Sequence, residues 1–120
     1  MIHIFCSSRY KISQEIIERS AKRLLDKHGV SPSTVLNIAF VGKRKMKEIA
    51  NTYKHEDVAL PVLSFGYMND PALTEEKILG EVVICYPQAV LLAAEREKRV
   101  DIMLDQLIEH GILNILKPTP

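Results

Sequence analysis

Apolar residues recur along most of this chain at one of two spacings, every second residue or every third to fourth residue. Alternation and short apolar runs predict four β-strands, over residues 2–6, 34–41, 60–67 and 79–85. In the first strand Ile2, Ile4 and Cys6 share one face, which is typical of a half-buried strand. The second strand is rich in β-branched residues and predicts an interior strand, whereas Pro61 indicates that the third strand begins at an edge.

The longer spacing predicts four helices, over residues 13–28, 43–54, 87–98 and 100–116. Ser13 is a good N-cap for the first helix, and Gly29 suits the left-handed residue that follows the end of that helix. The second helix carries an apolar stripe, which consists of Met46, Ile49, Ala50 and Tyr53. Residues 69–71 predict a turn, and residues 74–77 predict a loop or one helical turn.

The order of the predicted elements is βαβαββαα, which does not alternate strictly between strand and helix. This order predicts the α+β class, with a mixed four-stranded sheet packed against four to five helices. The 120 residues suffice for one hydrophobic core and are few for two. We therefore expect residues 1–120 to form a single domain.

The composition is that of an ordinary globular protein. Hydrophobic residues make up 47% and charged residues 26%, and the net charge of +1 means that an RNA partner would need a local basic patch. No apolar stretch approaches the ~20 residues that span a bilayer, and no signal-peptide pattern opens the chain, which predicts a cytoplasmic protein. Cys6 and Cys85 lie in apolar runs without Cys-x-x-Cys spacing, so we expect both to be reduced and buried.

The segment from His110 to Pro120 has the spacing of a three-histidine zinc site. Two helix residues four apart point along one face, and a catalytic zinc usually takes three protein ligands and an open position. Here the second position is Asn114, a weak neutral donor, and the third is Pro120, whose side chain cannot bind. The C-terminal carboxylate of Pro120 is the group that could replace the third ligand. Taken alone, His110 is also explained as a histidine near a helix end whose imidazole hydrogen-bonds to the backbone or to water.

Four segments from residue 51 onward resemble one known family in order and spacing. They are Asn51-Thr-Tyr53-Lys54-His-Glu-Asp57, Val62-Leu-Ser64-Phe65, Leu79-Gly80-Glu81-Val-Val-Ile84-Cys85 and His110-Gly111-Ile-Leu113-Asn114. They make the chain similar to the YbeY family of bacterial rRNA maturation endoribonucleases. The resemblance implies a YbeY-like metallohydrolase-type scaffold, zinc as cofactor, and RNA as substrate.

The resemblance carries the first zinc ligand onto His110 alone, because Asn114 and Pro120 occupy the other two ligand positions. Zinc is therefore expected to bind weakly or not at all. The family arginine that acts on RNA phosphate becomes Lys54, which keeps the charge but not the bidentate fork. The family aspartate after Leu-Gly becomes Glu81. Further departures from the family pattern are Leu60, Pro61, Lys98 and Arg99.

A short cationic run opens the second predicted helix and consists of Lys43, Arg44, Lys45 and Lys47. Cations near a helix N-terminus oppose the macrodipole, so the run does not simply stabilise the helix. It predicts contacts with RNA phosphates, and a solvated helix face is the alternative interpretation. A nucleophile and base formed by Ser64 and His110 would lack the Gly-x-Ser-x-Gly turn of serine hydrolases.

We expect a YbeY-like rRNA maturation or ribosome-assembly factor that acts on or binds 16S rRNA and the small ribosomal subunit. Lys54, His110 and Glu81 are the candidate catalytic residues, and Lys54 and the cationic run are the candidate RNA-binding residues. Glu81, Glu109 and the terminal carboxylate are candidates to complete a metal site. A small-subunit ribosomal protein and an assembly GTPase are further partners that the resemblance implies. The alternatives are a non-catalytic RNA- or protein-binding module and a fold kept for a protein contact unrelated to RNA.

Overall fold

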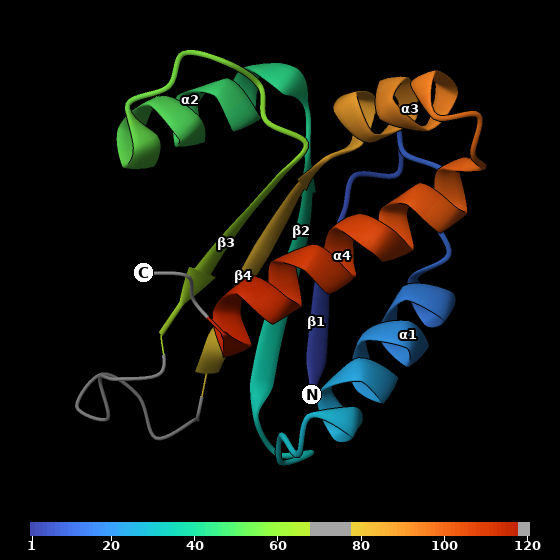
Figure 1. Ribbon diagram of the computed structural model, residues 1–120, viewed down its shortest axis with the longest axis vertical. Helices are drawn as coiled ribbons and strands as arrows, with labels where there is room; N and C mark the ends of the chain where they lie inside the picture. Colours follow the sequence, from blue (N-terminus) through green and yellow to red (C-terminus); the bar gives the residue numbers. More distant parts are fainter. Residues whose placement is uncertain (68–77, 118–120) are drawn as a thin grey trace.

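The computed structural model describes residues 1–67 and 78–117, and a four-stranded sheet lies at its centre (Figure 1). The strands are β1 (Ile2–Phe5), β2 (Val35–Val41), β3 (Val62–Gly66) and β4 (Ile78–Cys85), in the order β1-β2-β4-β3. β1, β2 and β4 are parallel, and β3 runs antiparallel to β4. The structure confirms the mixed sheet, the interior second strand and the edge position of the third.

Four helices complete the described part of the chain: α1 (Gln14–Lys27), α2 (Lys43–Lys54), α3 (Tyr86–Glu95) and α4 (Val100–Leu116). The Ser13 hydroxyl caps α1 by accepting a hydrogen bond from the Ile16 backbone N–H at 3.4 Å. Gly29 follows α1 with a φ of 73°, the left-handed conformation that its lack of a side chain favours. No helix within the described ranges is long and apolar enough to cross a membrane.

Helix α3 ends at Glu95, three residues before the predicted Lys98, because a left-handed turn stops it. Glu97 has a φ of 52°, and the backbone N–H of Lys98 donates to the carbonyl of Ala93 at 2.9 Å. This hydrogen bond across the helix end is the usual one where a left-handed residue terminates a helix. Glycine normally supplies that conformation, so Glu97 gave no sequence signal.

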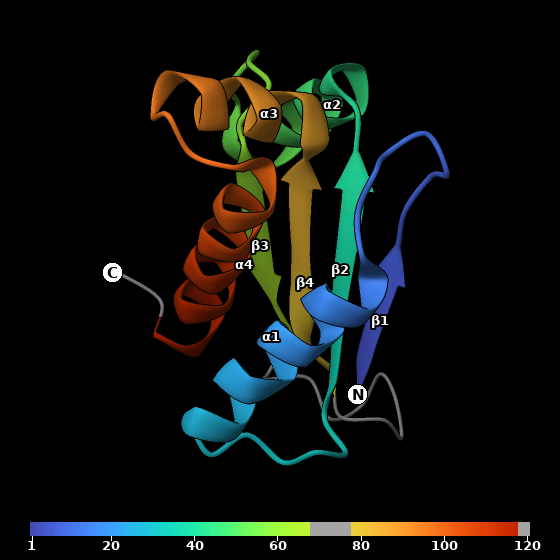
Figure 2. The same cartoon turned by 90° about the vertical axis from the view of Figure 1, so that its right-hand side faces the viewer.

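The helices cover both faces of the sheet, as the turned view shows (Figure 2). α1 and α4 pack on one face, where their apolar sides bury Leu36, Ile38, Val82 and Ile84. α2 packs on the opposite face through Met46 and Ala50, which contact the second core cluster of Leu63, Val83 and Cys85. Successive strand residues therefore serve two separate cores.

Two side chains, Tyr53 and Cys6, are less buried than their predicted positions required. Tyr53, at the end of the α2 stripe, is 65% exposed, because its ring packs edge-on against Phe65 at a centroid distance of 4.9 Å without entering the core. Cys6 is half-buried beyond the end of β1, whereas Cys85 is fully buried as predicted. Both cysteines are free. The predicted turn at 69–71 and the segment 74–77 lie outside the described residues.

Candidate functional site

Two glycines let helix α4 lie close to the sheet. A Cβ atom added to Gly111 would come within 2.7 Å of the Val82 Cγ1 atom. One added to Gly80 would overlap the Phe65 carbonyl oxygen of β3 and come within 3.1 Å of the Ile115 side chain of α4. Real Cβ atoms do not come within 3.0 Å of such neighbours, so Gly111 sets how near α4 comes to β4, and Gly80 sets how near β3 comes to β4.

The side chains of His110 and Asn114 are exposed on the side of α4 that faces the β3 edge. Glu109 and Asp105 line a groove between α4 and α1, and α1 lies toward the opposite, β1 edge of the sheet. At about 100° per residue, His110 falls on the other side of Gly111 from Glu109. The predicted pair thus shares one exposed helix side, whereas Glu109 points toward α1 and does not join it.

Ser64 lies on the same face of the sheet as α4. It pairs with Val82 in the β3–β4 ladder, and directly paired residues of neighbouring strands point to the same face. Its side chain is half-buried on β3, so the structure brings Ser64 to the sheet edge that His110 also faces. None of the hydrogen bonds found in residues 1–67 and 78–117 joins Ser64 to His110, and no nucleophile–base pair is formed.

Glu81 lies on the opposite face of the sheet, so the structure does not bring it to His110. Its ladder partners are Asn37 on β2 and Phe65 on β3, and it alternates with Val82, which contacts α4. The pKa of the nearby Tyr67 phenol is raised, first by burial and then by the negative charge of Glu81. Glu81 therefore belongs to the surface beside α2.

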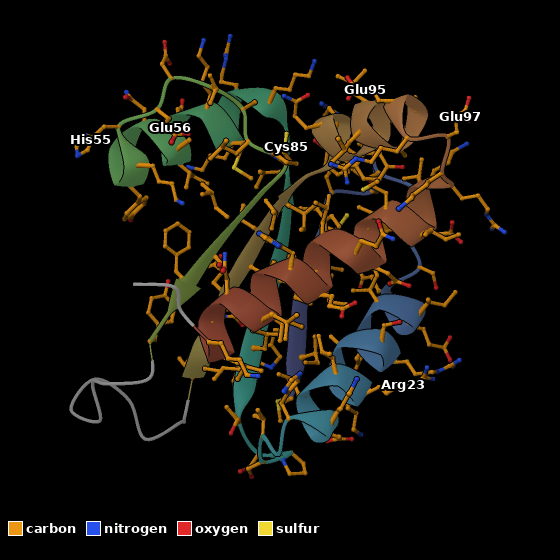
Figure 3. The ribbon with its side chains drawn as sticks, in the orientation of Figure 1. Arg23, His55, Glu56, Cys85, Glu95 and Glu97 are labelled. Carbon is orange, nitrogen blue, oxygen red and sulfur yellow. The ribbon has the colours of Figure 1, made fainter. Side chains whose placement is uncertain are left out.

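Lys54 is the last residue of α2 and is exposed. His55, which follows it, adopts a left-handed conformation with a φ of 56° and ends the helix. His55 and Glu56 are labelled at this end of α2 in Figure 3, across the β3 edge from α4. Tyr53, next to Lys54, packs on Phe65 and so places Lys54 on the α2 face of that edge.

The four residues of the cationic run are all exposed in the first turns of α2. Gly42 precedes them as N-cap, and no side chain caps this helix. Lys47 reaches Asp57 at an Nζ–Oδ1 distance of 3.8 Å, a pair exposed enough to contribute little to stability. The structure places the run at the opposite end of α2 from Lys54, so the predicted RNA-binding residues extend along the whole helix.

Comparison with known proteins identifies the family. The profile of the family described as Endoribonuclease YbeY matches residues 4–116. The chain belongs to the YbeY family. It is 34% identical to an endoribonuclease YbeY of Dehalococcoides mccartyi strain BAV1 over 117 residues, which cover 88% of this chain and 73% of that protein. An endoribonuclease YbeY of Pseudomonas putida strain W619 is 34% identical over 86 residues, covering 72% of this chain and 55% of that protein.

A solved structure shares the fold at lower identity. The solution structure of TM1509 from Thermotoga maritima matches with a TM-score of 0.66 and 20% identity, over 96% of this chain and 71% of that one. The comparisons confirm both the family resemblance of the sequence motifs and the predicted fold class.

The zinc that YbeY resemblance implies does not fit the donors that the structure describes. Within residues 1–67 and 78–117 no group of three or more His, Cys, Asp or Glu side chains could hold a metal ion. His110 offers one imidazole and Asn114 one neutral amide oxygen, whereas a catalytic zinc needs three protein ligands. Pro120, at the third ligand position, lies outside the described residues.

A polar and aromatic group beside α2 was not predicted for this YbeY family member. Asn37, Glu81 and Phe65 stand in one row across three strands, with Tyr67 nearby. The Asn37 Oδ1 atom is buried and has no hydrogen-bond partner among the described residues. A polar side chain in the middle of an otherwise apolar interior strand was the sequence signal that could have drawn attention to this row.

Proposed function

We propose that this protein takes part in rRNA maturation by binding RNA of the small ribosomal subunit. The observation that carries the proposal is the match to the Endoribonuclease YbeY family over residues 4–116, which spans every described strand and helix at least in part. The relatives from Dehalococcoides and Pseudomonas are named as endoribonucleases, so RNA is the substrate class that family membership supports.

The side chains that suit RNA lie along α2 and at the β3 edge. The cationic run provides four exposed positive charges at one end of α2, and Lys54 provides another at the far end. A lysine ammonium binds phosphate as a point charge, without the two parallel hydrogen bonds of an arginine. Contact with the phosphate backbone by such residues gives affinity that falls as salt rises.

Hydrolysis is the part of the family function for which this chain offers the fewest groups. His110 and Asn114 share one side of α4, but Glu81 is behind the sheet and Glu109 faces α1. A metal in a complete site would lower the pKa of a bound water and make it a nucleophile. A non-catalytic RNA-binding module is therefore the second candidate function, and the replacement of a histidine ligand by Asn114 favours it.

One experiment separates the two candidates. The protein is purified without added metal, its zinc content is measured, and cleavage of a small-subunit rRNA fragment is followed with and without a chelator. Stoichiometric zinc with cleavage that the chelator abolishes would establish the endoribonuclease. Absence of zinc and of cleavage, with RNA binding retained, would establish the binding module. Absence of RNA binding would contradict the proposed function in both versions.

Partners in the same pathway are also part of the proposal: the small ribosomal subunit, a small-subunit ribosomal protein and an assembly GTPase, in the cytoplasm. They follow from the resemblance of the sequence motifs to the family. Sedimentation of the purified protein with isolated 30S subunits tests the first of these. Co-sedimentation is expected, and it should weaken when Lys54 and the cationic run are replaced by glutamine.

A further inference from the structure

The carboxyl ends of the three parallel strands meet at one end of the molecule, the upper end in Figures 1 and 2. The helix that follows β1 packs on one face of the sheet, and the helix that follows β2 packs on the other. Neighbouring parallel strands whose connections leave toward opposite faces form a crevice, and such crevices commonly bind ligands in open α/β sheets.

Two tyrosines, Tyr10 and Tyr86, lie at this end of the molecule. The rings of Tyr10 and Tyr86 are stacked at a centroid distance of 4.7 Å, and the Tyr86 hydroxyl donates to the Lys11 carbonyl at 3.5 Å. A Cβ atom on Gly42 would come within 3.2 Å of the Tyr10 hydroxyl. The loop from Cys6 to Ser13 is thus packed directly against the start of α2 and the start of α3. A partner that approaches this end would therefore meet the side chains exposed around the packed tyrosine pair.

Exposed cations lie next to the tyrosine pair on two separate segments. Arg9 and Lys11 flank Tyr10 in the loop, and Lys43 and Arg44 follow Gly42 in α2, all four exposed. Burial raises the pKa of the Cys85 thiol, and the charge of Lys43 is among the influences that oppose this rise. Lys43 therefore stands near the end of β4. We call these four residues the strand-end surface.

The charges of the strand-end surface are not neutralised by ion pairs in the described structure. The ion pairs found within residues 1–67 and 78–117 join Arg19 to Glu15, Lys47 to Asp57 and Arg99 to Asp101, and none includes a residue of the strand-end surface. Two labelled acidic residues, Glu95 at the end of α3 and Glu97 in the turn that follows it, lie at the end of that helix away from α2 (Figure 3). With a net charge of only +1 on the whole chain, such a local concentration of positive charge favours a polyanionic partner.

We propose that the strand-end surface binds the phosphate backbone of RNA, so that Arg9 and Lys11 continue the RNA path that runs along α2. The inference rests on the proposed function and adds two residues from a different element to it. α2 is about 18 Å long for its 12 residues. A single strand that follows it from Lys54 to Lys43 would reach the β1–α1 loop directly.

The test compares two double variants of the full chain that remove the same charge. Arg9→Gln with Lys11→Gln alters the strand-end surface, and Lys22→Gln with Lys27→Gln alters exposed cations of α1. Binding to a single-stranded small-subunit rRNA fragment is measured by fluorescence anisotropy at several salt concentrations. Each phosphate contact contributes about 0.7 to the slope of log affinity against log salt on single strands. The first variant should lose about 1.4 from the slope and bind several-fold more weakly, and the α1 variant should lose neither.

Each outcome bears on a different claim. Equal slopes for the two variants, with wild-type binding intact, would overturn the strand-end surface and leave the proposed function standing. If the wild type fails to bind RNA, the strand-end surface and the proposed function are both contradicted. The charge-keeping pair Arg9→Lys with Lys11→Arg should restore the slope, and circular dichroism checks that each variant is folded. Loss of binding in the charge-keeping pair would show that shape, and not charge, is recognised, which also contradicts the proposal.

Discussion

At the scale of single residues, the contacts of a few side chains decide how α4 meets the sheet and which groups it offers. Because Gly111 has no side chain, the Val82 side chain packs directly against the helix backbone at this position, and Val82 is completely buried. One residue earlier, His110 is exposed on the side toward β3. A close helix–sheet contact therefore lies beside the only histidine of α4.

Replacing Gly111 with alanine should destabilise the fold. The new methyl group would overlap a valine that has no room to move, and overpacking of this kind costs about 1–3 kcal/mol. The better helix propensity of alanine offsets about 1 kcal/mol of that cost. Because the 2.7 Å approach places the cost in the upper half of that range, we expect urea unfolding to show a net loss of about 1–2 kcal/mol. The exposed Asn114→Ala in the same helix is the control and should change stability by less than about 0.5 kcal/mol. An unchanged or more stable Gly111→Ala protein would refute the close contact.

Replacing Asn114 with histidine should create a zinc-binding pair with His110. Two imidazoles four residues apart on a helix can grip one ion, whereas an amide oxygen is a poor zinc donor. Zinc at about 100 times the Kd of the variant should stabilise it by about 2.7 kcal/mol, seen as a higher Tm. Wild type and Glu109→His should show no such shift, because residue 109 points toward α1. An equal shift in the wild type would mean that its own donors suffice.

The phenol of Tyr67 should titrate late. Burial, then the charge of Glu81, then Tyr53 raise its pKa above the ordinary value of about 10. The folded protein thus holds this proton more tightly than the unfolded chain, so its contribution to stability is complete below pH of about 10 and declines above it. NMR titration of labelled tyrosines should show a lower Tyr67 pKa in Glu81→Gln than in the wild type. The charge-matched Glu109→Gln should leave the Tyr67 pKa unchanged. No change in Glu81→Gln would place that carboxylate elsewhere.

At the scale of elements, α2 combines a function with a structural cost. Its first turns carry cations where the helix dipole disfavours them, and its last residue, Lys54, carries one where the dipole favours it. A stabilising role would call for the reverse arrangement at the start of the helix. The arrangement suits a helix whose charges contact phosphates.

Lys45→Glu should therefore move stability and RNA affinity in opposite directions. Removing a disfavoured cation and adding a favoured anion should raise the free energy of unfolding by about 0.5–1 kcal/mol. RNA affinity should fall, because a positive charge in the path becomes negative. Lys54→Glu is the matched control at the other end, where both stability and affinity should fall. Chemical denaturation and anisotropy on the same samples measure both. Parallel changes in Lys45→Glu would contradict this account of α2.

The elements themselves could be predicted well from the sequence, because their ends carry local signals. Ser13 and Gly29 delimit α1 as expected, and α4 has the predicted bounds. The end of α3 was missed because Glu97 adopts a conformation normally left to glycine. Local capping chemistry is readable from the chain, whereas a strained residue held by its surroundings is not.

At the scale of the whole molecule, the candidate site could be predicted only in part. Helical spacing placed His110 and Asn114 on one side of α4. Alternation separates Glu81 from Val82, but only tertiary packing decides that α4 covers the Val82 face. The sequence therefore predicts Glu81 beside His110, whereas the two lie on opposite faces of the sheet. Likewise the approach of the Tyr10 loop to Gly42 joins residues 32 positions apart, for which the sequence carries no local signal.

We propose that this YbeY family member binds RNA through exposed cations without help from a metal. The most direct test is the affinity of the purified protein for a small-subunit rRNA fragment, measured by anisotropy across a salt series in the presence and absence of a chelator. We expect affinity that falls steeply with salt and is the same with and without the chelator. Affinity that the chelator abolishes, or that does not respond to salt, would contradict RNA binding by the exposed cations alone.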